Sequence, residues 1–196
     1  MRHAIFACLA SLVLSIAARA AEAPGDPVEA VWLAQRVTFQ YRSEGHMYRC
    51  DVLAYKVQRI LQQVGARDRL IVRSVACRDF AGLAQLEVIM ESPVVATPEN
   101  IRAITDYDSK DELIARVHGT SLPAAAELER FPAVWESISI ARALKIHLEA
   151  GDCALVQQLR RQILPKMSVQ IVKDIDQVDC TQANPRLTVM ALVARL

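Results

Sequence analysis

The stretch Ala30-Val31-Trp32 returns 103 residues later as Ala133-Val134-Trp135, and this recurrence decides how the rest of the chain is interpreted. The four cysteines beyond the N-terminal leader follow the same shift: Cys50 falls on Cys153, and Cys77 on Cys180. Self-similarity at a fixed spacing is typical of an internal repeat, which sets the architecture. The sequence therefore predicts one unit used twice, each copy with its own cysteine pair.

Residues 1–20 have the three parts of a secretory signal peptide. Arg2 begins a short polar region, residues 4–17 are apolar apart from two serines, and Ala18-Arg19-Ala20 supplies the small-x-small cleavage pattern. The apolar run is shorter than the about 20 residues that span a bilayer. We expect a periplasmic or secreted protein, with a mature chain that begins near Ala21 and a tether over residues 21–29.

The charge of the mature chain is nearly balanced. Cleavage of the leader would remove Arg2 and Arg19, which leaves 21 of the 23 basic residues against 22 acidic ones. Nucleic acids and anionic membranes usually bind through an excess of positive charge. We therefore expect no nucleic-acid partner, and no later segment of the mature chain has the length and purity of a membrane-spanning helix. A protein or another component of the cell envelope remains as the partner.

The cysteines indicate two disulfides, because thiols in an exported protein meet an oxidising compartment. Four cysteines allow three pairings, and the repeat selects the two symmetric ones, Cys50–Cys77 and Cys153–Cys180. Each bridge would close a loop of about 28 residues and stabilise the fold by about 3–4 kcal/mol. The 26-residue gaps contain no CxxC or Cys/His cluster, so neither a metal site nor a redox-active pair is expected.

Hydrophobic periodicity predicts the order β-α-β-β in each unit, and so an α+β fold with two tandem, pseudo-symmetric units. In unit one, residues 30–91, the elements are a strand around Val37–Tyr41, a helix from Cys50 to a stop at Gly65, and strands Leu70–Ala76 and Leu83–Met90. In unit two, residues 133–196, they are a strand with Ile138 and Ile140 inward, a helix capped by Asp152 and ended by Pro165, and strands Val169–Val178 and Leu187–Val193. The units could share one six-stranded sheet or pack as two lobes.

Residues 92–132 have no counterpart in the repeat. Ser109 and Glu112 have the spacing of a capping box, and Gly119 would end the short helix that follows. Thr97-Pro98 begins a further turn of helix. The segment is interpreted as a linker, with a lid or a partner-binding arm as the alternative.

No catalytic or cofactor motif occurs, so no catalytic residue, cofactor or metal is assigned. Four residues are candidates for binding. The equivalent placement of Trp32 and Trp135 favours structural anchors that lock the edge of each unit, and the alternative is a twofold-related aromatic patch for binding. His46 lies in the turn before Cys50, and Arg142 replaces the apolar Phe39 of unit one. Asp174 and Asp176 could hold a hard cation, although alternation on a solvated strand explains them as well.

Several of these residues together resemble a family of exported proteins of Gram-negative bacteria. The resemblance rests on the following stretches: Val31-Trp32, Phe39-Gln40-Tyr41, Cys50-Asp51, Lys56-Val57, Arg59-Ile60-Leu61, Gly65-Ala66-Arg67 and Cys77, then Gly151-Asp152-Cys153, Val156 and Cys180. It covers nearly the whole mature chain and implies the compartment and the tandem Trp…Cys…Cys architecture. The family has no assigned activity, so it implies no catalytic residue.

Three functions are consistent with the sequence. The first is a non-enzymatic exported protein that binds another protein or an envelope component. The second is a hydrolase or transferase with a site between the units that uses Glu44, His46 or Arg142. The third is a secreted inhibitor of an enzyme, a role that small disulfide-bonded proteins often have.

The disulfide scheme can be tested by peptide mapping of the mature protein without reduction. We expect one peptide that joins Cys50 to Cys77 and another that joins Cys153 to Cys180, because only these pairings respect the repeat. A peptide that joins Cys77 to Cys153 would overturn the scheme.

Overall fold

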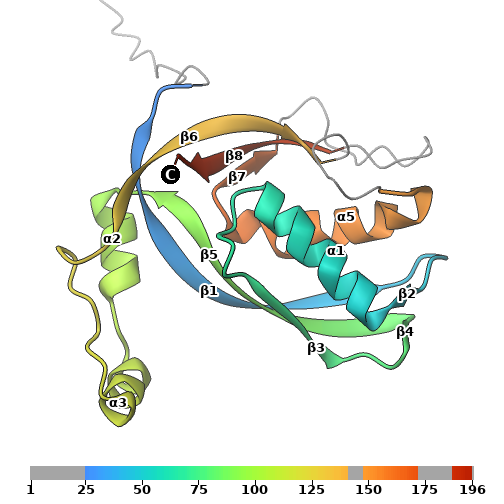
Figure 1. The fold of residues 1–196 in the computed structure, drawn as a ribbon, viewed down its shortest axis with the longest axis horizontal. Coiled ribbons are helices and arrows are strands. Elements are labelled where there is room, and N and C mark those ends of the chain that lie inside the picture. Colours follow the sequence, from blue (N-terminus) through green and yellow to red (C-terminus); the bar gives the residue numbers. More distant parts are fainter. Residues whose placement is uncertain (1–24, 141–147, 172–186, 196) are drawn as a thin grey trace, which may run out of the picture.

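The computed structural model describes residues 25–140, 148–171 and 187–195. The fold is mixed α+β, with a six-stranded antiparallel sheet in the order β3-β5-β1-β6-β8-β7 and a separate β2–β4 pair. The elements are β1 (Val28–Arg42), β2 (Tyr48–Arg49), α1 (Cys50–Gln63), β3 (Ile71–Ala76), β4 (Phe80–Ala81), β5 (Leu83–Val95), α2 (Pro98–Thr105), α3 (Ser109–His118), β6 (Arg130–Ser139), the 3-10 turn η1 (Ala150–Asp152), α5 (Cys153–Gln162), the 3-10 turn η2 (Leu164–Lys166), β7 (Val169–Ile171) and β8 (Thr188–Ala194). Figure 1 shows the long strands curving around α1 and α5.

Strand β1 runs through the middle of the sheet. Val37, Phe39 and Tyr41 are buried and alternate with exposed residues, as the period of two predicts. The strand is longer than predicted because it has two neighbours: β5 pairs with it from Ala30 to Arg42, and β6 pairs with its first residues, from Val28 to Val31. The single six-stranded sheet is therefore the arrangement present, rather than two lobes.

Helices α1 and α5 supply the other side of the core. Each begins at its cysteine, as predicted, and each buries an apolar stripe at helical spacing. These stripes pack against the inward side chains of the strands in one hydrophobic cluster. The stripe of α1 consists of Leu53, Val57, Ile60 and Leu61, and that of α5 of Ala154, Leu155, Val156 and Leu159.

Two glutamines of α5 bond the free edge of β1 beyond its pairing with β6. The Gln162 side-chain amide accepts from Gln40 N–H at 2.9 Å and donates to Gln40 C=O at 2.8 Å. Gln158 makes the same two bonds to Arg42, at 2.8 and 2.7 Å. Four helical residues rise about 6.0 Å and two strand residues about 6.8 Å, so helix and strand can run alongside each other. The helix thus satisfies backbone groups that would otherwise form an exposed sheet edge.

At the N-termini of α5 and α3, the structure differs from the caps that the sequence predicts. Asp152 precedes α5, but its carboxylate does not cap the helix, because it is fully buried and binds side chains from the first half of the chain. The capping box of α3 lies one residue earlier than predicted: Asp108 accepts from the N–H of Asp111, and the Asp111 carboxylate accepts from Asp108 N–H. Aspartate serves as a cap as well as serine does, and the sequence offers both.

The segment between β5 and β6 contains α2 and α3. The Thr97 side chain caps α2, and Gly119 ends α3 in a left-handed conformation, as predicted for this glycine. In Figure 1, α2 lies near the end of β5, whereas α3 stands away from the sheet. Within the described part of the chain, no helix is both long and apolar enough to cross a membrane.

In the second half, the buried faces of the strands agree with the predicted parity. Ile138 and Ile140 of the first strand are buried, as are Leu187, Val189 and Ala191 around β8. Of the predicted strand Val169–Val178, only the first part is described, as β7. Its remainder, Cys180 and the leader lie outside the described residues.

Gly65 is required where α1 ends against the second half of the chain. Its φ of +102° is unfavourable for other residues, and a Cβ there would lie 2.5 Å from the backbone oxygen of Leu192 in β8. The predicted stop at this glycine is therefore confirmed, and it has a second cause, the close approach of two backbones.

Replacing Gly65 by alanine tests this contact. Gly65→Ala should destabilise the protein more than Gly45→Ala, because Gly45 has a similar φ of +112° but no atom within 4 Å of an added Cβ. Backbone strain alone costs about 1–3 kcal/mol, and the clash should add about 1–3 kcal/mol at Gly65 only. Urea unfolding of both variants gives the comparison, and equal losses would contradict the close contact.

Candidate functional site

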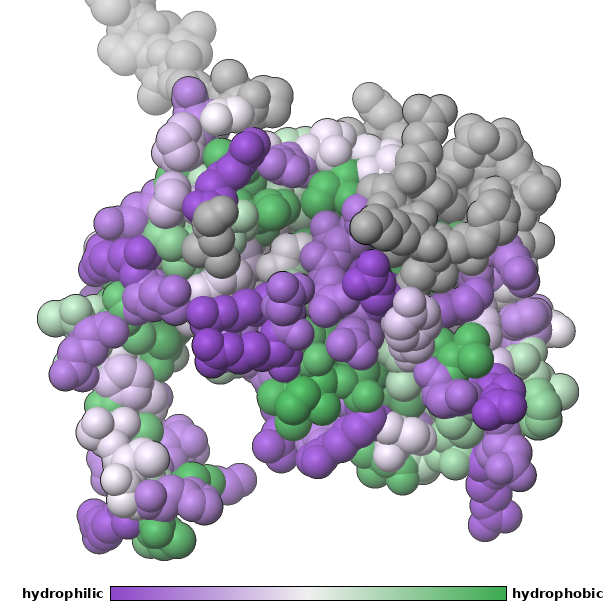
Figure 2. All heavy atoms as spheres, viewed as in Figure 1, coloured by the Kyte–Doolittle hydropathy of each residue, from purple (hydrophilic) through white to green (hydrophobic). Residues whose placement is uncertain are grey.

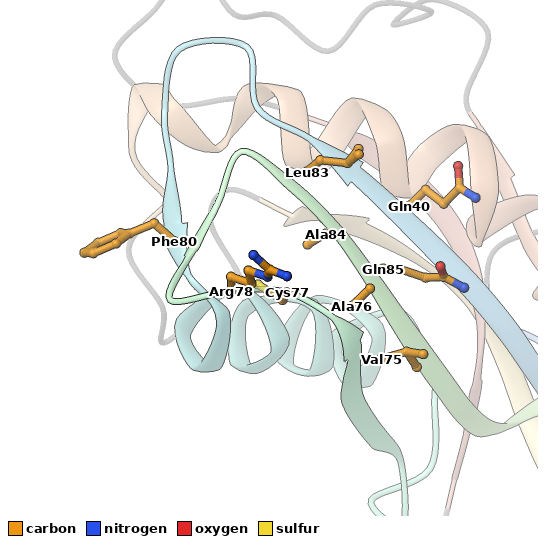
Figure 3. Close-up of a pocket in the computed structure, with 9 residues that line it drawn as sticks. All are labelled: Gln40, Val75, Ala76, Cys77, Arg78, Phe80, Leu83, Ala84 and Gln85. Atoms are coloured by element: carbon orange, nitrogen blue, oxygen red, sulfur yellow. The ribbon is translucent and has the colours of Figure 1, made fainter.

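A groove lies at the end of the sheet where β3, β4, β5 and β1 meet. Its volume is about 630 Å³. The lining residues are Gln40 from β1, Val75 and Ala76 from β3, Cys77 and Arg78 from the following turn, Phe80 from β4, and Leu83, Ala84 and Gln85 around the start of β5. In Figure 3, Val75, Gln40 and Gln85 lie along the strands, whereas Phe80 points outward from the hairpin.

The apolar side chains of this groove are unusually exposed. Val75 has 60% of its surface accessible, Phe80 62% and Leu83 68%. An exposed apolar cluster with polar residues around it is a common mark of a binding surface. Together with Ile71 at the start of β3, these three residues form what we call the edge patch. On the face shown in Figure 2, hydrophobic side chains gather over the β3 region.

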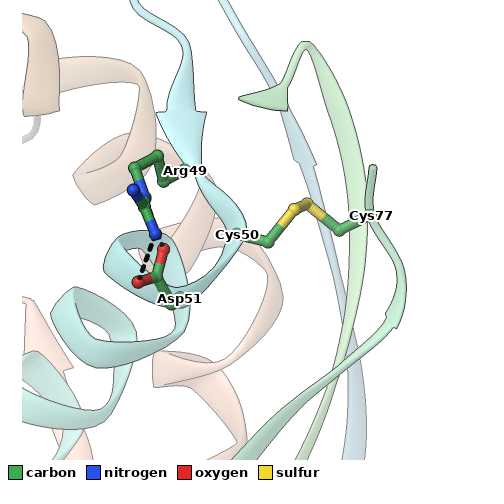
Figure 4. The surroundings of a disulfide bond; sticks show 4 residues. All are labelled: Arg49, Cys50, Asp51 and Cys77. Atoms are coloured by element: carbon green, nitrogen blue, oxygen red, sulfur yellow. Dashed lines mark hydrogen bonds and ion pairs between the residues drawn. A yellow bond between two sulfur atoms is a disulfide. The ribbon is translucent and has the colours of Figure 1, made fainter. Parts of the chain in front are cut away.

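A second cavity, of about 500 Å³, adjoins the groove at Cys77 and Phe80. The Cys50–Cys77 disulfide lies between the two, as predicted, with its Cα atoms 6.0 Å apart. Figure 4 shows that it joins the start of α1 to the chain just after β3. The bridge therefore holds the turn that carries Arg78 and Phe80 against the helix.

Backbone contacts also fix this turn. Asp79 has a φ of +28°, a conformation that residues other than glycine rarely adopt. Its C=O accepts from Cys50 N–H at 3.3 Å, and β4 pairs with β2. The turn is thus tied to both the helix start and β2, so the groove wall is preorganised.

Charged groups of both signs surround the second cavity. Arg49 and Asp51 form an exposed ion pair at 3.2 Å, and the pKa of the Asp51 carboxyl is lowered mainly by this hydrogen bond. Asp79 is exposed and also lines this cavity, and the exposed Arg78 lines the adjoining groove. The rim therefore offers charged groups that can bond carboxylates and amines of a ligand, and the edge patch offers exposed apolar surface.

A buried polar network lies between α1 and α5, away from the groove. The Asp152 carboxylate, with no exposed surface, accepts from the Tyr48 hydroxyl, from Lys56 Nζ at 2.7 and 2.8 Å and from Glu149 N–H at 2.7 Å. Burial, followed by the bond and charge of Asp152, raises the pKa of Tyr48, so its hydroxyl remains a donor. All members are satisfied by one another, which is typical of a structural network.

His46 lies beside this network, where its ring packs edge-on against Tyr48 at 4.6 Å. Its backbone C=O accepts from the hydroxyls of Tyr41 and Ser43, and its ring leaves no room for a side chain at Gly151. His46 thus contacts both halves of the chain. Glu44 is exposed in the same turn.

The two tryptophans belong to a second hydrophobic cluster, centred on the β1–β6 pairing. Trp32 stacks on Phe131 with ring centroids 4.4 Å apart, and the Arg67 guanidinium lies 4.9 Å over the Trp32 ring. Both indoles are half-buried. The structure therefore brings Trp32 and Trp135 into one cluster, but at the sheet joint rather than in the groove.

Several predicted residues lie outside the described parts of the chain: Arg142, Cys180, Asp174 and Asp176. Cys153 begins α5, where its Sγ lies 3.7 Å from Gln157 Nε2. Among the described residues, no three His, Cys, Asp or Glu side chains are grouped in a way that could hold a metal ion.

The edge patch was not predicted from the sequence. The sequence places Val75 and Leu83 only within the predicted strands Leu70–Ala76 and Leu83–Met90 and gives neither a role in binding. The one signal was Phe80, a large apolar residue in a turn between two strands. Comparisons with protein-family models, with curated proteins and with solved structures find no match to this chain.

The buried network predicts that the protein loses much of its stability when the charge of Asp152 is removed. Asp152→Asn should lower the free energy of unfolding by about 3–5 kcal/mol, because it leaves the Lys56 ammonium without its counter-charge. Adding Lys56→Met should restore part of the loss. Asp51→Asn, which breaks the exposed pair with Arg49, is the matched control and should leave the urea midpoint unchanged. Equal midpoints for the two single variants would refute a structural role for the network.

Proposed function

We propose that this chain is an exported, non-enzymatic binding protein whose groove, with the edge patch beside the Cys50–Cys77 disulfide, holds an apolar segment of a partner. Exposure of Val75, Phe80 and Leu83 around a preformed cavity is the observation that carries the proposal. Isolated apolar residues on a surface need no explanation, whereas several exposed apolar residues that line one cavity do.

The rigidity of the groove supports binding. The disulfide, the Asp79 turn and the β2–β4 pair hold its wall in place before any ligand arrives. A preorganised surface loses little conformational entropy on association, so more of the contact energy is available for affinity. The buried network favours the same assignment, since Asp152, Tyr48 and Lys56 are bonded to one another instead of facing the groove.

The proposal includes export of this chain to the periplasm or out of the cell. The signal-peptide pattern of residues 1–20 and the periplasmic or secreted location are supported by the Cys50–Cys77 disulfide, since such bonds persist in oxidising compartments. For the same reason, we propose that Cys153 and Cys180 form a second disulfide.

We also propose that the body consists of two β-α-β-β units related by the 103-residue shift, as in the exported family that the sequence resembles. Glu29 lies directly opposite Pro132, the residue 103 positions later, in the β1–β6 pairing, as a twofold relation requires. Helices α1 and α5 begin at Cys50 and Cys153.

In the two units, the pairing of the last strand with the first differs from the 103-residue shift by an even number of residues. Val37 pairs with Val88, whereas its equivalent Ile140 donates its N–H to Leu187 and not to Ala191, the equivalent of Val88. The difference is four residues, so the inward face of the strand is kept.

The binding function can be tested with a photo-crosslinking amino acid at position 83, and with the same amino acid at position 113 as the control. Leu113 lies on α3 and is similarly exposed, at 56%. With the mature protein in periplasmic extract, we expect a discrete adduct from position 83 that Phe80→Ser weakens at least tenfold, because the partner rests on the edge patch. An adduct from position 113 alone would assign binding to the α3 arm, and none from either would remove the proposal.

A further inference from the structure

The outer edge of β3 has backbone groups that no other described residue bonds. Leu70 C=O, just before the strand, accepts from the Gln58 side chain of α1 and so points away from β5. Alternate residues of a strand direct their N–H and C=O to the same side. Val72 and Ser74 therefore present two donors and two acceptors outward, while Ile71 and Arg73 pair with Ile89 and Glu87 of β5.

This edge contrasts with that of β1. The free edge of β1 is closed by Gln158 and Gln162, whereas no such side chain bonds Val72 or Ser74 in the described structure. Ser74 is exposed and Val72 half-buried, so an approaching backbone can reach both. The β-bulge between Ser74 and Ala76 ends regular pairing at that point.

The side chains of this edge specify what could pair with it. Arg73 is exposed and bonds Glu87 of β5, which also pairs with Arg36 of β1 at 3.3 Å. Two arginines thus share one carboxylate, which leaves a positive charge at the edge. Ile71 and Val75 of the edge patch flank Arg73 two positions away on either side.

We propose that β3 binds an extended segment of a partner protein by antiparallel strand addition, and that this segment carries an acidic residue opposite Arg73 with apolar residues two positions before and after it. This inference rests on the proposed binding function and names its mode. Opposite charges facing each other across strands are favourable, and like charges are not. A second copy of this chain, paired about Arg73, would place two arginines in opposition and is disfavoured.

The pairing geometry strengthens the charge preference. Val72 and Ser74 would form the hydrogen-bonded pairs, so Arg73 would lie in a non-hydrogen-bonded pair, where facing side chains are closest. Val75 also lines the groove, so a segment added along β3 continues into the proposed binding site.

The probe is the capped peptide Thr-Val-Thr-Glu-Thr-Val-Thr, compared with the same peptide containing Lys instead of Glu. We expect the Glu peptide to bind the mature protein about two- to fivefold more tightly, the range of a cross-strand charge pair, in fluorescence anisotropy. Arg73→Glu should reverse the order of the two peptides. N-methylation of the two threonines beside Glu should weaken binding at least tenfold, because it removes the donors to the edge.

Ser74→Pro and Ser74→Ala form a matched pair of variants. Proline removes an outward N–H that β5 does not use, and alanine keeps it, so only Ser74→Pro should lose binding. Should the proline variant not fold, hydrogen exchange of the wild-type protein gives the same test, since the Glu peptide should slow exchange at the Val72 and Ser74 amides.

Three results would overturn the inference. One is that neither peptide binds at 1 mM, the second that protection appears away from β3, and the third that a dimer of the wild-type protein is abolished by Ser74→Pro, which would make a second copy the occupant. A crosslink from position 83 that survives Ser74→Pro would retain the binding function while rejecting strand addition.

Discussion

The pairing of Val28–Val31 with residues 130–133 is the constraint on which the rest of this structure depends. It joins three strands from residues 28–95 to three from residues 130–194 and makes a single sheet of them. The other contacts between these two parts follow from it: Asp152 reaches Tyr48 and Lys56, Gly65 meets Leu192, and α5 lies along β1. A short strand pairing thus positions the buried network and both helices.

The sequence predicts these elements well where one pattern determines them. Strict alternation predicts the buried face of β1, helical spacing predicts α1 and α5, and the 103-residue shift of the cysteines predicts the Cys50–Cys77 bridge. The extent of β1 could not be predicted, because its first residues are fixed by pairing with β6, a partner about 100 residues away. For the same reason Asp152 was assigned to a cap: its position before α5 is local, whereas its bonds to Tyr48 and Lys56 are not.

The candidate site was the least predictable part. Trp32, Trp135 and His46 are conspicuous in the sequence, yet the tryptophans stabilise the sheet joint and His46 packs against Tyr48. The residues of the edge patch are ordinary strand residues whose exposure depends on what the fold leaves uncovered. Helix α1 is tied by the disulfide to the end of β3, and the outward side of that strand stays open. The exposure of the edge patch depends on how the strands and helices are arranged in space, so no short stretch of sequence predicts it.

The glutamine contacts of α5 also limit how this fold can change. Each Gln side chain takes the place of a neighbouring strand. However, the four helical residues from one Gln to the next rise about 0.8 Å less than the two strand residues from Gln40 to Arg42. A third glutamine would be displaced by about 1.6 Å and could not make both bonds at ordinary hydrogen-bond lengths. A one-residue insertion between Gln158 and Gln162 would rotate one of them by about 100° away from β1. Substitutions on the outer face of α5 should therefore accumulate freely over evolution, while changes in its length should be rejected.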